Sequence, residues 1–105
     1  MKIIYLLEER IPLDLRNLVI EAIEKAEFEY KLMFYTDPIK KQIDLITWAD
    51  AVLCAPGRKI QDIVMDAGKH IKLYQLWSSG YDKFDCERAR YLGIPVANNG
   101  GANGV

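Results

Sequence analysis

Five short apolar runs alternate along this chain with segments that show the spacing of amphipathic helices. We predict that these runs are strands, at residues 2–7, 28–35, 51–55, 73–77 and 94–97. The crossovers between them take roughly 15–20 residues, which suits a helix that connects two parallel strands. The alternation therefore predicts an α/β fold: a flavodoxin-like, doubly wound parallel sheet of five strands in the order 2-1-3-4-5, in three layers.

The intervals between the runs carry the apolar stripes and end signals of helices. The predicted buried stripes are Leu15, Leu18, Val19, Ala22, Ile23 and Ala26, then Ile39, Ile43 and Ile46, then Ile60, Ile63, Val64 and Ala67. Gly68 and Gly93 are placed to end the third and fourth helices. We predict that Asp82 is the N-cap of the fourth helix and that Asp85 is a first-turn acid favoured by the helix dipole.

Composition limits the classes of function that suit this chain. A length of 105 residues suits one domain, and the even mixture of hydrophobic and polar residues, with a formal net charge of −1, argues against disorder and against a nucleic-acid surface. No apolar run approaches the about 20 residues that span a membrane, and no signal-peptide cleavage site follows the first strand. Cys54 and Cys86 lack the spacing of a metal site, so we predict reduced thiols, no metal, and a cytoplasmic protein.

A turn of small and polar residues follows the fourth predicted strand. It consists of Ser78, Ser79, Gly80 and Tyr81. A turn of this kind, at the carboxyl end of a strand and opening a helix, presents backbone N–H groups that can hold an anion. An ordinary strand-to-helix turn also favours Gly and Ser for backbone reasons. The residues by themselves therefore leave both interpretations open.

Three motifs fill the last third of the chain. They are S-S-G-Y-D-x-F-D at residues 78–85, E-R-A-R-Y-L at 87–92 and G-I-P-V-A-N-N-G-G-A-N-G-V at 93–105. In identity and spacing of glycine, aspartate and asparagine they resemble the NAD-dependent D-2-hydroxyacid dehydrogenases, in which a G-Y/V-D-x-x-D turn precedes G-I-x-V-x-N and G-A/x-N-S. One departure is Gly104, which stands where Ser or Thr is usual in that family.

The resemblance implies that residues 1–105 are part of a substrate-binding domain. The complete enzyme would transfer hydride between NAD(H) and a small 2-hydroxy or 2-oxo acid. By resemblance, the amides of Ser79 and Gly80 hold the substrate carboxylate in the matching turn. Ser78 and Tyr81 of the same turn are further candidates for substrate binding, as is Arg58, because a guanidinium can pair with a carboxylate.

The resemblance also implies which functional residues lie outside residues 1–105. The family's catalytic Arg, Glu and His, and its glycine-rich NAD loop, belong to the region that would follow residue 105, so we assign no catalytic residue and no nucleotide-binding domain to this chain. Asn103 matches a family asparagine beside the cofactor cleft and is a weak candidate for cofactor binding. We expect the chain alone to be inactive, NAD to bind mainly to the other domain, and the full-length protein to form a homodimer.

Other proteins of the same fold supply the alternatives. A phosphorelay receiver needs an aspartate at the end of the third strand and a lysine at the end of the fifth, where this chain has residues 54–56 (Cys-Ala-Pro) and 98–99 (Asn-Asn). An FMN-binding flavodoxin needs a phosphate loop after the first strand, which residues 8–12 (EERIP) do not provide. A non-catalytic binding or regulatory domain, either corepressor-like or stand-alone, remains open as an alternative function.

Overall fold

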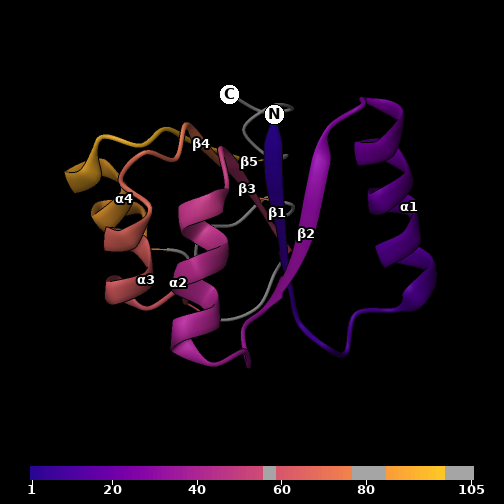
Figure 1. Ribbon diagram of the computed structural model, residues 1–105, viewed down its shortest axis with the longest axis horizontal. Coiled ribbons are helices and arrows are strands. Elements are labelled where there is room, and N and C mark those ends of the chain that lie inside the picture. The colour runs from indigo at the N-terminus through magenta and orange to yellow at the C-terminus, as the bar shows by residue number, and fades with distance from the viewer. Residues whose placement is uncertain (56–58, 77–84, 99–105) are drawn as a thin grey trace.

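The protein forms one parallel β-sheet with helices on both faces (Figure 1). The computed structural model describes residues 1–55, 59–76 and 85–98. The strands are β1 (Lys2–Leu7), β2 (Glu29–Phe34), β3 (Ala51–Cys54), β4 (Leu73–Leu76) and β5 (Val96–Asn98), and the helices are α1 (Leu13–Lys25), α2 (Ile39–Trp48), α3 (Asp62–Ala67) and α4 (Cys86–Leu92). The order β2-β1-β3-β4-β5 and the parallel pairing of every neighbour confirm the predicted topology.

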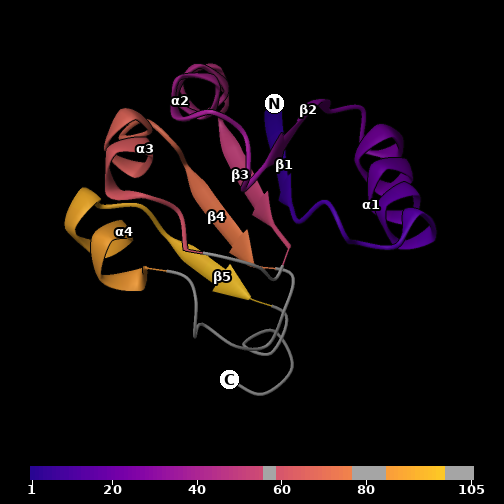
Figure 2. The same ribbon diagram turned by 90° about the horizontal axis from the view of Figure 1, so that it is seen from below.

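The helices lie in two layers around the sheet. Figure 2 shows α1 on one face, over β1 and β2, and α2, α3 and α4 on the other. Side chains alternate along each strand, so Ile4 and Leu6 of β1 enter the core under α2–α4 while Tyr5 and Leu7 enter the smaller core under α1. This explains why the first strand is hydrophobic from Ile3 to Leu7: it is covered on both faces.

The first helix buries a narrower face than its sequence predicts. Val19 and Ile23 are buried, whereas Leu18 is 60% exposed and Ala22 is also exposed. The reason is that α1 lies over the edge of the sheet formed by β1 and β2 (Figure 2), where Val19, Ile23 and the partly buried Ile20 meet the strands. Arg16 is part of this contact, with its guanidinium carbon 5.5 Å from the centroid of the Phe34 ring.

The third helix also differs from its predicted stripe. It starts at Asp62, so Ile60 precedes it, although the Ile60 side chain is buried as expected. Val64 and Met65 are fully buried, and Ile63 is 57% exposed. The helix has fewer than two turns, so its packing against α2 and α4 decides which side chains are buried, and the spacing of its apolar residues does not.

The N-cap of the fourth helix differs from the predicted one. Asp85 is the N-cap, and its Oδ1 accepts the backbone N–H of Arg88 at 2.9 Å. The prediction that Asp85 lies inside the first turn is therefore wrong, and Asp82 lies outside the described residues. Gly93 ends the helix in the left-handed conformation, with φ of 77°, as its position after the last turn predicts.

Strand boundaries differ slightly from the predicted runs. Phe28 precedes β2 and is 37% exposed, and the last two residues before Val96 lie outside β5. In β2, Met33 shares the alternating face of Glu29 and Lys31, which the sequence predicts to be partly polar, but Met33 is fully buried under α2. An edge strand can still be covered on both faces, and here the second helix extends over it. None of the described helices is long and apolar enough to cross a membrane.

Candidate functional site

Because all strands run in the same direction, their carboxyl ends meet at one edge of the sheet, where open α/β sheets bind ligands. The candidate residues Arg58, Ser78, Ser79, Gly80, Tyr81 and Asn103 follow these ends in the chain, and all of them lie outside the described residues. The structure does describe the chain that leads to them. Cys54 of β3 pairs in register with Leu76 of β4, so the segments that start at residues 56 and 77 begin on neighbouring strands.

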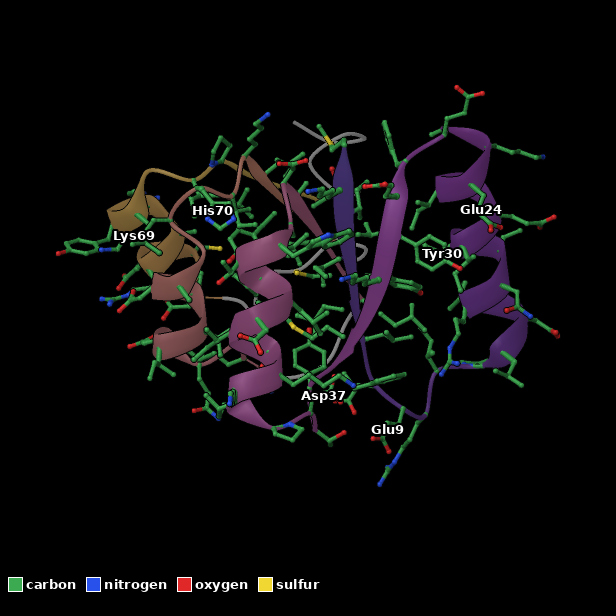
Figure 3. The ribbon with its side chains drawn as sticks, viewed as in Figure 1. Glu9, Glu24, Tyr30, Asp37, Lys69 and His70 are labelled. Carbon is green, nitrogen blue, oxygen red and sulfur yellow. The ribbon has the colours of Figure 1, made fainter. Side chains whose placement is uncertain are left out.

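Polar side chains form hydrogen bonds at the part of this edge where β1 and β2 end. The Thr36 hydroxyl donates a hydrogen bond to the Glu9 carboxylate, which joins the end of β1 to the turn after β2. Asp37 Oδ2 accepts the backbone N–H of Phe34 at 3.0 Å. Figure 3 shows Glu9 and Asp37 at this end of the molecule, with Lys69 and His70 away from it. These bonds hold the chain after β1 and after β2 at this edge, whereas His70 lies away from it (Figure 3), with Nε2 at 2.9 Å from the carbonyl oxygen of Ala49.

A half-buried hydroxyl and a buried thiol lie at the end of β3, in the middle of the edge. The Tyr35 hydroxyl donates to the carbonyl oxygen of Ala55 at 3.1 Å, just beyond β3. Burial raises the pKa of Tyr35 well above its ordinary value, with smaller contributions from Cys54 and Glu8. Burial likewise raises the pKa of the Cys54 thiol, which is therefore a neutral core group and not a nucleophile at neutral pH.

Gln42 is a structural residue of this region that the sequence analysis missed. It is 5% exposed, and its Nε2 donates to the carbonyl oxygens of Asp37 at 2.8 Å and Tyr35 at 3.3 Å. Its position in the sequence indicates burial. Gln42 follows Ile39 by three residues and precedes Ile46 by four, so it lies on the apolar stripe of α2. A polar residue on a buried stripe needs hydrogen-bond partners, and here it fixes the turn between β2 and α2.

An ion pair joins two described residues that border the undescribed segments 56–58 and 77–84 in the sequence. Lys59 Nζ is 3.3 Å from Asp85 Oδ2, and the Lys59 side chain is 64% exposed whereas that of Asp85 is 17% exposed. The hydrogen bond from the Arg88 N–H holds the pKa of Asp85 below its ordinary value, and Lys59 acts in the same direction. Asp85 is therefore ionised at neutral pH and caps the helix as a carboxylate.

The described part of the edge carries no group of three or more His, Cys, Asp or Glu side chains that could hold a metal ion. Cys54 is buried, Cys86 is half-buried, and both are free thiols. The described residues at this edge thus supply two strand ends in register, a capped helix and hydrogen-bonded turns.

Solved structures with this architecture include dehydrogenases. The NAD⁺-bound 3-phosphoglycerate dehydrogenase of Entamoeba histolytica is 28% identical, with a TM-score of 0.79 over 93% of this chain and 32% of that one. The NAD⁺-bound D-lactate dehydrogenase of Lactobacillus jensenii is 26% identical, with a TM-score of 0.69 over 93% and 29%. A D-2-hydroxyisocaproate dehydrogenase, at 15% identity, has a TM-score of 0.73 over 93% and 29% and shows the fold alone.

The chain therefore spans less than a third of the length of these solved structures. A comparison with curated protein sequences gives no match. The family model for the catalytic domain of D-isomer specific 2-hydroxyacid dehydrogenases matches residues 5–105, which is nearly the whole chain. This match, the five-stranded parallel sheet and the motifs of the last third agree, and the chain belongs to the D-isomer specific 2-hydroxyacid dehydrogenase family as its catalytic domain.

Proposed function

We propose that residues 1–105 form the substrate-binding half of an NAD-dependent oxidoreductase that acts on a 2-hydroxy or 2-oxo acid. The observation that carries this proposal is the family match over residues 5–105. The sheet topology supports it, because β3 and β4 are neighbours and lead directly into the candidate residues. NAD would supply the hydride chemistry between nicotinamide C4 and C2 of the acid.

The proposed role of this domain is to bind the substrate carboxylate. We assign that contact to the backbone N–H groups of Ser79 and Gly80, since amide donors to a carboxylate form strong, charge-assisted hydrogen bonds. Gly80 has no Cβ, which allows a ligand to approach the backbone closely. Ser78 and Tyr81 belong to the same turn, and Arg58 follows the neighbouring strand with a guanidinium suited to a carboxylate.

The remaining roles are proposed for the complete protein. Asn103 would lie beside the cofactor, and most NAD contacts, with the catalytic Arg, Glu and His, would come from sequence that follows residue 105. The domain alone is then inactive, because it binds substrate without the hydride donor or the acid–base group. We expect the complete protein to work as a homodimer in the cytoplasm.

The first experiment is the mass of the native polypeptide in its source cells, detected with an antibody raised against this domain. A band larger by one or two domains, with NADH oxidation by the purified protein in the presence of a 2-oxo acid, is the expected result. A band near 12 kDa and no NADH oxidation would contradict the proposal. That outcome would favour a non-catalytic binding or regulatory domain.

The second experiment changes the proposed carboxylate contact. Gly80→Val in the complete protein should raise KM for the oxo acid by about tenfold to a hundredfold, the cost of a lost hydrogen bond to a charged group. Ala22→Val, at an exposed position of α1, is the matched control and should leave KM unchanged. A Gly80→Val protein with native KM would remove Gly80 from the site.

A further inference from the structure

β2 forms one border of the sheet (Figure 2), with β1 on one side and no described strand on the other. Its six residues make it the longer of the two edge strands, since β5 at the opposite border has three. The backbone N–H and C=O groups of successive residues in a strand point to opposite sides, so every second residue of β2 points away from β1. An edge of this kind can pair with a further strand.

The hydrogen bonds identify which residues of β2 point outward. The Glu29 N–H donates to the carbonyl oxygen of Met1 at 3.1 Å, so the backbone groups of Glu29 face β1. By alternation those of Lys31 also face β1, and those of Tyr30 and Leu32 face outward. Within the described part of the chain, no strand pairs with these outward groups.

The next outward residues, one at each end of β2, already form hydrogen bonds. The Phe28 N–H donates to the carbonyl oxygen of Ile23 at 3.3 Å. At the other end, the Phe34 N–H donates to Asp37 Oδ2 and the Phe34 carbonyl oxygen accepts the Asp37 N–H, each at 3.0 Å. These bonds leave the middle of the strand, around Tyr30, as the part that a further strand can join.

The charges of β2 favour one antiparallel arrangement of two copies. When the twofold axis passes through Tyr30, Glu29 lies opposite Lys31 of the second copy, and Lys31 lies opposite its Glu29. Both side chains are exposed, and opposite charges directly across an antiparallel pair are stabilising. An axis through Lys31 would place two lysines opposite each other, which is unfavourable. A lysine on an edge strand ordinarily discourages pairing, but here its counter-charge lies two residues away on the same strand.

We propose that the edge of β2 is an interface between two copies of this chain, paired antiparallel about Tyr30. The two Tyr30 residues exchange backbone hydrogen bonds, and Leu32 lies opposite Phe28 of the second copy, whose side chain is 37% exposed in the single chain. The contact between two strand edges is small, so the association is weak. This inference concerns assembly and does not depend on the proposed function.

Sedimentation equilibrium of the 105-residue chain over a wide range of concentrations measures the association. The wild type should form a dimer whose Kd rises with salt. Glu29→Lys and Lys31→Glu each turn two opposite-charge pairs into like-charge pairs, so each should raise Kd by about fivefold to a hundredfold, and the double reversal should restore it. Glu21→Lys and Lys40→Glu, at exposed positions of α1 and α2, make the same changes in net charge and should leave Kd unchanged.

The double reversal also separates pairing from a local effect of Lys31. Its Nζ lies 4.5 Å from the centroid of the Trp48 ring, a contact that both Lys31→Glu proteins lose, so restored dimerisation cannot come from that contact. Hydrogen exchange gives a second readout: the Tyr30 amide should exchange more slowly as concentration rises, and the Glu29 amide, bonded to β1, should not change. A chain that is monomeric at every concentration would overturn the inference, as would a Kd that the double reversal does not restore.

Discussion

Gly68 ends α3 at a point where the core has no space for a side chain. A Cβ at this position would lie 2.5 Å from Cγ2 of Ile46 and 3.1 Å from Cγ1 of Ile71. Ile46 is fully buried and Ile71 is 3% exposed, so neither side chain can turn into solvent. Since φ at Gly68 is −107°, the backbone there suits any residue, and the glycine is required for space.

Gly68→Ala should therefore destabilise the protein by overpacking, at a cost of about 1–3 kcal/mol. With an unfolding entropy of about 2.1 cal/mol/K per residue, the whole chain has roughly 0.22 kcal/mol/K, so Tm should fall by about 5–14 °C. Thermal and urea unfolding, followed by circular dichroism, measure both quantities. The denaturant slope should stay the same, because the change acts on the folded state.

A double-mutant cycle identifies the cause. Ile46→Ala removes the Cγ2 atom that the new Cβ would meet and costs about 2–5 kcal/mol alone. Together with Gly68→Ala it should cost less than the sum by about 1 kcal/mol or more. Gly93→Ala is the control: its φ of 77° makes alanine strained by about 1–2 kcal/mol although nothing lies within 4 Å, and Ile46→Ala should not rescue it. Native stability of Gly68→Ala, or a strictly additive cycle, would refute the reasoning.

Two further predictions concern single polar groups. The Arg88 N–H lowers the pKa of Asp85 in the folded protein. The ionised carboxylate therefore stabilises the folded state at pH values above the pKa of the unfolded chain, and this stabilisation is lost as the pH falls through the lowered pKa of the folded state. The wild type should thus have a higher Tm than Asp85→Asn at pH 7, and the difference should shrink below about pH 4. A Tm difference that stays constant with pH would contradict this prediction. Gln42→Met should cost about 1–3 kcal/mol in urea unfolding by leaving the Asp37 carbonyl unpaired, while exposed Gln61→Met should be neutral.

The sequence carries the proposed substrate-binding residues only as a motif. Residues 78–81 and the family pattern around them come from the local sequence, and the structure describes β4 before them and α4 after them. The ion pair between Lys59 and Asp85 could not be predicted, because the two residues are far apart in the chain and no sequence pattern indicates that their side chains meet. Such a contact depends on how α3 and α4 pack, which is a property of the whole fold.

The topology was determined by the sequence alone. Long crossovers between apolar runs require parallel strands, and the left-handed turn at Gly93 follows from local backbone sterics. Tertiary structure decided which apolar side chains are buried, as Leu18 and Ile63 show, and why Gly68 must be glycine. The physical reason is that periodicity reports which residues share a side of a helix, whereas burial depends on how much of that side a neighbouring element covers.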